Sequence, residues 1–213
     1  MHLHPITKLQ REHSNMWRVQ QVMHLQLERL WRGEPTDSAL LANAFYYMRK
    51  FPSVVHHPKE DMIYEKLLEA GTPLAKEVRH ILTQHEELYE IEDELIDLVL
   101  QLPKCRERVL QLGRRYLNIQ TEHMETEERL LFPQARKLLT AGDWREVRAH
   151  FEALKDPLFG RRVAARFQSL YDYLLREAAD DGLAVPGAEP RTANVPAAKT
   201  VAASRRARMT RHA

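Results

Sequence analysis

Two pairs of histidine and glutamate, each four residues apart, could bind transition metals, because imidazole and carboxylate groups are ligands for such ions. The first pair is His56 and Glu60, within FPSVVHHPKEDMIY, and the second is His123 and Glu127, within EHMETEERLLFP. On an α-helix this spacing stacks the two side chains on one face. Each pair can thus supply two metal ligands from one helix, although a single pair of this kind also occurs as a solvated contact on a helix face.

Two more histidines lie on the apolar stripes of other helical segments. His13 follows Ile6 and Leu9 in one stripe, and His85 follows Val78 in another. Any one of these histidines alone is more often an ordinary core residue than a ligand. Four inward histidines and two inward carboxylates together predict a site for two metal ions.

Four long amphipathic helices must position these residues. We expect them at residues 6–31, 40–68, 74–102 and 105–139, with Asp37 or Ser38 as the cap of the second and a kink or short break in it around Pro52. Short connections between long helices indicate an antiparallel up-down-up-down bundle. At 1.5 Å per residue, the six groups lie roughly 10–24 Å from one end of that bundle, a common depth within the error of the helix ends.

Composition supports an all-α protein that acts without a membrane span. The chain has only 7 glycines and 1 cysteine in 213 residues, and it contains no apolar run of eighteen residues. The N-terminus lacks the apolar core of a secretory signal, and one cysteine, Cys105, cannot form an intrachain disulfide. We therefore expect a cytoplasmic protein.

Periodicity and composition divide the chain into three predicted regions. Residues 1–140 form the bundle, and residues 141–179 form an extension of two shorter helices, the first capped by Asp143 and the second at 161–178. Residues 180–213 are rich in Ala, Pro and Arg and predict a disordered tail. Residues 187–213 carry six basic residues and one acidic residue, so this basic tail is a weak candidate for nucleic-acid contact.

The ligand set suits iron, manganese or zinc, and the absence of thiolates argues against a structural zinc site. Carboxylates from facing helices can bridge two cations, with histidines in terminal positions and an oxo or hydroxo group completing the bridge. His57 and Tyr89 are candidates for residues that contact the metal ligands without binding the metal themselves. His57 is turned about 100° from His56 on the helix, which favours this supporting role.

The sequence resembles the bacterial hemerythrin-like, or HHE cation-binding, family over about residues 4–140. The motifs that carry the resemblance are QREH ending at His13, HHPKED, QHEEL at His85, and EHMETEERLLFP. The resemblance implies a carboxylate-bridged centre of two non-haem iron ions, and DPLFG resembles an extension of longer members. Oxygen carriers of this family have a fifth histidine four residues before the one at His85, where this chain has Ile81. The resemblance thus implies an open or solvent-filled position on one metal.

Three functions are compatible with this sequence. The first is a protein, not an enzyme, that binds or senses O2 or NO, or handles iron. The second is a di-iron oxidase or peroxidase, or a factor that repairs iron–sulfur centres, although that subgroup typically has an N-terminal cysteine segment missing here. The third is an interaction module stapled by metal, whose protein partner the sequence does not identify.

Overall fold

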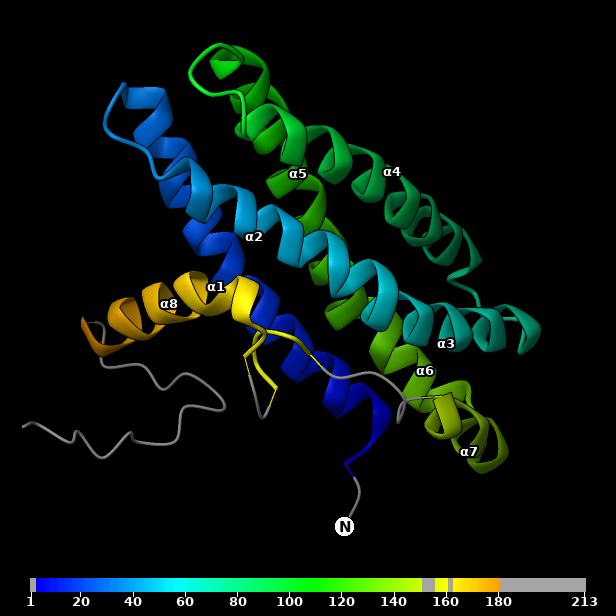
Figure 1. Ribbon diagram of the computed structural model, residues 1–213. Helices are drawn as coiled ribbons and strands as arrows, with labels where there is room; N and C mark the ends of the chain where they lie inside the picture. Colours follow the sequence, from blue (N-terminus) through cyan, green and yellow to red (C-terminus); the bar gives the residue numbers. More distant parts are fainter. Residues whose placement is uncertain (1–2, 151–155, 161–162, 181–213) are drawn as a thin grey trace, which may run out of the picture.

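The computed structural model describes residues 3–150, 156–160 and 163–180, and within these ranges it contains helices and no strands. Four antiparallel rods form the body of the molecule (Figure 1). The rods are α1 (Pro5–Arg32); α2 (Ser38–Lys50), η1 (Pro52–His56) and α3 (His57–Glu69); α4 (Ala75–Val99); and α5 (Arg106–Thr126), η2 (Glu127–Leu131) and α6 (Phe132–Leu138). The predicted all-α bundle is confirmed.

The four rods are arranged in a ring. α1 packs against α2 and α5, and α4 packs against the same two helices from the other side. Each rod therefore has its sequence neighbours as its spatial neighbours, and the first rod closes on the fourth. Short connections between consecutive rods produce this order.

The helices begin and end at local sequence signals, close to the positions predicted from the sequence. The Asp37 carboxylate accepts a hydrogen bond from the Leu40 N–H at 2.9 Å and caps α2. Gly71 adopts φ 67° directly after the second rod, a left-handed conformation that glycine adopts without steric cost. Gly33 does the same after α1, with φ 71°.

The second and fourth rods each contain a π-helical turn next to their metal-ligand motif. In η1 the His56 N–H lies 3.2 Å from the carbonyl oxygen of Phe51, five residues earlier. A proline follows each π turn at the second residue of the next helix, Pro58 after η1 and Pro133 after η2. Proline has no N–H to continue the regular ladder, so the chain widens there and continues. The predicted kink at Pro52 is therefore a wide turn within a continuous rod.

A layer of polar residues divides the interior into two apolar clusters. One cluster contains Met16, Leu88 and Tyr116, and the other contains Leu9, Ile81 and Leu131. On α1, His13 falls between Leu9 and Met16, and on α4, His85 falls between Ile81 and Leu88. The predicted ligands thus lie in a polar layer with apolar side chains on both sides.

The C-terminal extension contains α7 (Ala141–His150), η3 (Ala165–Phe167) and α8 (Gln168–Asp180). α7 packs on α1 and α3, and α8 packs on α1 and α2 (Figure 1). α7 begins two residues before the predicted cap, because the Asp143 carboxylate accepts hydrogen bonds from both the N–H and the hydroxyl of Thr140. The last helix was predicted from residue 161, but Ala164 is extended, with ψ 139°, and the helical turn starts at Ala165.

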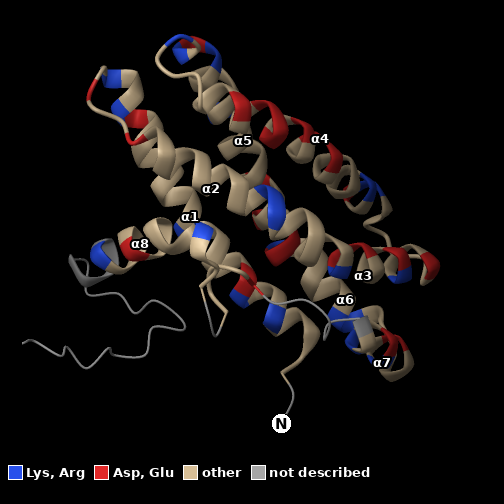
Figure 2. Ribbon diagram, in the orientation of Figure 1, with Lys and Arg blue, Asp and Glu red and all other residues tan. Residues whose placement is uncertain are grey.

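Acidic residues are frequent along α4 (Figure 2), and its Glu87 and Glu94 pair with Arg115 and Arg108 of α5. No helix within the described ranges has both the length and the apolar character needed to cross a bilayer. The predicted tail beyond residue 180 lies outside the described residues.

Candidate metal centre

The four rods bring the six predicted ligands together in the polar layer. All six side chains are buried, and every rod contributes at least one of them. They are His13 on α1, His56 on η1, Glu60 on α3, His85 on α4, His123 on α5 and Glu127 on η2. That these residues bind metal remains a prediction, but their convergence is a property of the fold.

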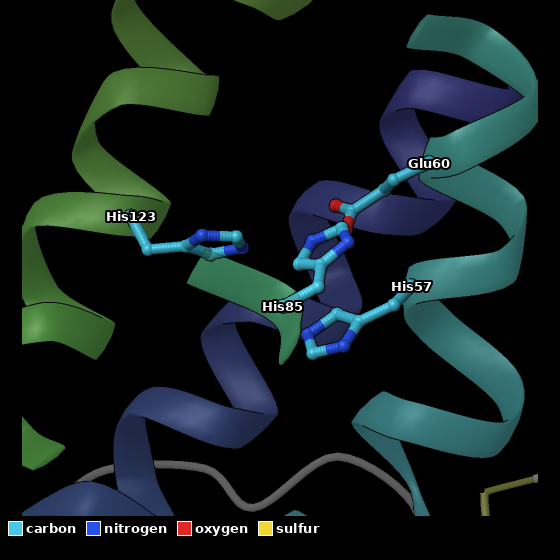
Figure 3. A group of neighbouring side chains, drawn as sticks. All are labelled: His57, Glu60, His85 and His123. Carbon is cyan, nitrogen blue, oxygen red and sulfur yellow. The ribbon is translucent and has the colours of Figure 1, made fainter. Parts of the chain in front are cut away.

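The ligand atoms form two adjoining groups. The three-histidine group consists of His57, Glu60, His85 and His123, each with one ligand atom within 4.8 Å of the others (Figure 3). The two-histidine group consists of His13, His56 and Glu60, within the same distance. Glu60 belongs to both groups, which is what a bridging carboxylate requires.

Helical geometry explains why Glu60 has an imidazole on each side. His56 precedes Glu60 by four residues and His57 precedes it by three, so the two rings flank the carboxylate one turn away. Glu60 Oε1 lies 2.9 Å from His56 Nε2, and Glu60 Oε2 lies 3.7 Å from His85 Nε2. One oxygen therefore faces each group.

Glu127 spans the same two groups from the fourth rod. Its Oε2 atom lies 3.3 Å from His13 Nε2, and its Oε1 atom lies 3.4 Å from His123 Nε2. The buried Tyr64 hydroxyl donates a hydrogen bond of 2.5 Å to Glu127 Oε1. The tyrosine thereby fixes the orientation of the second bridging carboxylate.

Four of the histidines are held through their Nδ1 atoms by residues from another rod. His56 Nδ1 is 2.8 Å from Glu12, and His85 Nδ1 is 3.0 Å from Asp61. The other two pairs are His123 Nδ1 with Gln84 at 3.2 Å and His13 Nδ1 with Glu128 at 2.9 Å. An acceptor at Nδ1 places the ring proton there and leaves the Nε2 lone pair for a metal.

These four bonds form a closed cycle around the ring of rods. The first rod supplies Glu12 to the second, the second supplies Asp61 to the third, the third supplies Gln84 to the fourth, and the fourth supplies Glu128 to the first. Each supplier is the immediate sequence neighbour of a predicted ligand. Sequence reasoning missed these four residues, although their position beside a ligand is a usable signal.

The inward atoms fit a metal better than they fit one another. The Nε2 atoms of all five histidines, both Glu60 oxygens and Glu127 Oε2 are buried without a hydrogen-bond partner in the described part of the chain. Several approach within 2.9–3.7 Å of one another but lack hydrogen-bond geometry. Unpaired buried polar atoms are costly, and a set of imidazole and carboxylate donors satisfies the preferences of iron, manganese and zinc.

Burial and neighbouring carboxylates separate the histidine pKa values. Burial lowers the pKa of His123 to about 4, with Glu127 offsetting part of the effect. Burial also opposes protonation of His56, but Glu60 and Glu12 outweigh it and raise the pKa of His56 to about 9. The pKa of His13 is raised in the same way by Glu127, Glu128 and Glu60. A cation entering the two-histidine group must therefore displace protons.

The two residues predicted to support the ligands have different positions. His57 is buried, and its ring stacks on His85 with centroids 3.9 Å apart, so it lies among the ligand atoms. Tyr89 lies outside the cluster, because its side chain is 43% exposed and the Arg49 guanidinium lies 3.2 Å from its ring centroid. Its position one turn beyond His85 carries it to the surface.

A comparison with protein-family models agrees with this geometry. The hemerythrin HHE cation binding domain matches residues 4–135, which is more than half of the chain. The chain belongs to this family. A search of curated proteins found no match.

Ile81 stands at the position where oxygen carriers of the hemerythrin HHE family have a fifth histidine. Ile81 is fully buried in an apolar cluster, so it contributes no ligand. His57 places an imidazole in the same group as His85 and His123. The adjacent rod therefore places an imidazole beside His85 and His123, and the expectation that one metal keeps an open position stays a prediction.

Proposed function

We propose that this hemerythrin-like protein holds two iron ions, one in each group, and binds O2 or NO at the two-histidine group. The difference between the groups is the observation that supports this proposal. The three-histidine group has one more imidazole than the two-histidine group, and Glu60 and Glu127 are available to both. A metal in the two-histidine group has fewer protein donors and so retains a position for a small ligand.

The surroundings of the two-histidine group suit an apolar diatomic. The Phe132 ring stacks on His13 with centroids 5.4 Å apart, and the Phe51 ring centroid is 6.3 Å from that of His56. Both phenylalanines are buried. Bound iron would supply reversible electron donation to the ligand, while these side chains restrict water and the Nδ1 bonds hold the imidazoles in place.

Metal loading followed by oxygen exposure tests the proposal. Protein reconstituted anaerobically with Fe(II) is expected to bind two ions and to develop charge-transfer absorption when O2 is admitted. His56→Ala should abolish that absorption, whereas His24→Ala, an exposed histidine on α1, should not change it. Protein that takes up no iron, or an unchanged spectrum in His56→Ala, would contradict the proposal.

Further assays on the same protein separate the alternatives. We propose binding rather than catalytic turnover, so loaded protein under O2 should not consume a reductant continuously, and it should consume peroxide only slowly. Sustained turnover lost in Glu127→Ala would instead favour an oxidase or peroxidase. If zinc and iron supported folding equally, and neither loaded form changed its absorption on exposure to O2, an interaction module stapled by metal would be favoured.

A further inference from the structure

A line of aromatic side chains leads from the two-histidine group to the surface beneath the C-terminal extension. The His56 and Phe51 ring centroids are 6.3 Å apart, and Phe51 stacks on Tyr47 at 5.6 Å. Tyr47 contacts Phe167 at 5.7 Å, and Phe167 contacts Tyr46 at 5.9 Å. Of these five rings only that of Tyr46 is partly exposed.

Tyr47 differs from the phenylalanines around it in having a proton acceptor. Its hydroxyl donates a hydrogen bond of 3.1 Å to Asp156 Oδ2, although Tyr47 is fully buried. The N–H groups of Leu158 and Phe159 bind the other carboxylate oxygen, Oδ1, each at 2.9 Å. Asp156 is therefore held with one oxygen aimed at the tyrosine.

The ionisation equilibria favour the same role. Burial raises the pKa of Asp156, only partly offset by its backbone hydrogen bonds, so this carboxylate is a better proton acceptor than an ordinary aspartate. Burial and Asp156 also raise the pKa of Tyr47 well above its usual value. Tyr47 thus remains a neutral phenol, and it loses its proton only when it also loses an electron.

We propose that Tyr47 and Asp156 form an electron relay that restores the metal centre from the surface after hydrogen peroxide has over-oxidised it. This inference rests on the proposed iron centre. A bound iron centre that supplies two electrons would reduce peroxide, with two protons from solvent, to two waters as the O–O bond breaks. Tyr47 returns those electrons one at a time, in two passes. In each pass its O–H bond breaks, the electron goes to the centre and the proton passes to Asp156 Oδ2, leaving a neutral tyrosyl radical.

An anionic one-electron reductant completes the sequence at the surface. The Arg166 guanidinium lies 3.4 Å from the Tyr46 ring centroid, and Lys50 Nζ lies 5.6 Å from it, so the outer end of the line is cationic. In each pass a reductant such as ascorbate supplies one electron to the Tyr47 radical through Tyr46 and Phe167. The proton then returns from Asp156 to the Tyr47 oxygen, so two passes return both electrons to the centre and leave both residues in their starting state.

The proposed electron relay uses residues of the C-terminal extension, and these residues do not belong to the metal site. Asp156 and Phe167 both belong to the extension, and Phe159 packs edge-on against Tyr47 at 6.1 Å. Without them Tyr47 would have neither its acceptor nor the ring contacts that lead through Phe167 to the Tyr46 ring. The extension therefore completes the route.

The test combines electron paramagnetic resonance with peptide mapping on iron-loaded full-length protein treated with hydrogen peroxide. A tyrosyl radical is expected, identified by its altered hyperfine pattern in ring-deuterated protein and removed by ascorbate. Tyr47→Phe, which keeps the ring, should eliminate the radical, and Tyr171→Phe on α8 should not. Asp156→Asn keeps an acceptor oxygen but takes no proton, and it should lower the radical yield by about tenfold or more.

Peptide mapping supplies a readout independent of the metal's own spectrum. Oxidised tyrosine should be found at Tyr46 and Tyr47 in the wild type and should fall at both positions in Tyr47→Phe. A radical that persists in Tyr47→Phe, or none in wild type that binds iron and responds to O2, would overturn the relay. Protein that binds no iron would overturn the proposed function instead, and the relay with it.

Discussion

The role assigned to His57 depends on whether its direction is compared with that of His56 or with that of Glu60. Judged against His56, it points about 100° away, but judged against Glu60 the two rings lie on opposite sides of one carboxylate. The structure places His57 in the three-histidine group, and its Nε2 atom is buried without a hydrogen-bond partner among the described residues. His57 therefore has the position of a ligand.

We expect His57→Gln to lower the number of tightly bound iron ions from two to one. Removing residues that merely orient metal ligands weakens binding by about 10–100-fold, so loss of a ligand should cost at least about 100-fold at that ion. Equilibrium dialysis with metal analysis measures the stoichiometry. Tyr89→Phe is the control, and two ions bound with unchanged affinity in His57→Gln would show that His57 is no ligand.

Glu92 is a buried carboxyl group that the metal site does not include. Tyr116 donates a hydrogen bond of 2.8 Å to its Oε1 atom, but Oε2 is buried and unpartnered within the described structure. Burial raises its pKa to about 8, only partly offset by Tyr116 and Arg49. The folded protein thus binds this proton more tightly than the unfolded chain does.

The sign of the pH effect follows from that difference. The stability that the bound proton contributes is complete below the unfolded pKa of about 4.5 and is lost as pH rises toward 8. Glu92→Gln should remove this loss, which is on the order of 3–5 kcal/mol at 1.36 kcal/mol per pKa unit. Urea unfolding at pH 5 and pH 9 measures it, with the exposed Glu90→Gln as the control. An equal pH slope in Glu92→Gln and wild type would refute the raised pKa.

At the scale of the elements, the two π turns set the rotation of the ligand-bearing helices. η1 adds one residue to a helical turn between α2 and α3; His56 is its last residue, and His57 is the first residue of α3. One residue corresponds to about 100° of rotation on a regular helix. The extra residue therefore turns both imidazoles toward the interior while α2 keeps its own apolar face buried.

Deleting Val54 should abolish metal binding and leave the helix content nearly unchanged. Val54 is the exposed residue of η1, so its removal costs little packing but restores the regular turn and rotates the ligands away. Circular dichroism measures helicity and dialysis measures bound metal. Val54→Ala should behave like wild type, and a deletion variant that still binds two ions would rule out this role for the π turn.

At the scale of the molecule, the extension shares the core of the bundle. Trp144 and Val147 belong to one apolar cluster, while Leu158, Leu170 and Leu174 belong to the other. A chain cut at residue 140, the predicted domain boundary, would expose the surfaces that these side chains cover. Burying one large apolar side chain contributes about 1.5–3 kcal/mol, so the loss should reach several kcal/mol.

We therefore expect residues 1–140 to unfold at a clearly lower temperature than the full chain, both measured without metal. The comparison chain ends at residue 180 and should match the full-length protein. Equal melting temperatures for residues 1–140 and the full chain would make the bundle an independent domain.

Periodicity along the sequence was enough to predict the bundle and the residues that converge in it. His13 and His85 lie on regular apolar stripes, so their inward direction follows from spacing alone. The π turns were not predicted, because they depend on which rotation the neighbouring rods accept. The Nδ1 partners were missed for a related reason, since Glu12 or Gln84 acquires its role only when the next rod is in place.

The cycle of Nδ1 bonds has a consequence for how the protein acquires metal ions. The four bonds connect every rod to the next without involving any inward-facing atom, so none of them has to break when an ion enters. Ions can therefore enter and leave the site with the four bonds in place, and divalent ions of similar preference compete for it by abundance. The ion recovered with the protein will accordingly reflect the supply in its surroundings at that moment, not the conditions under which the chain folded.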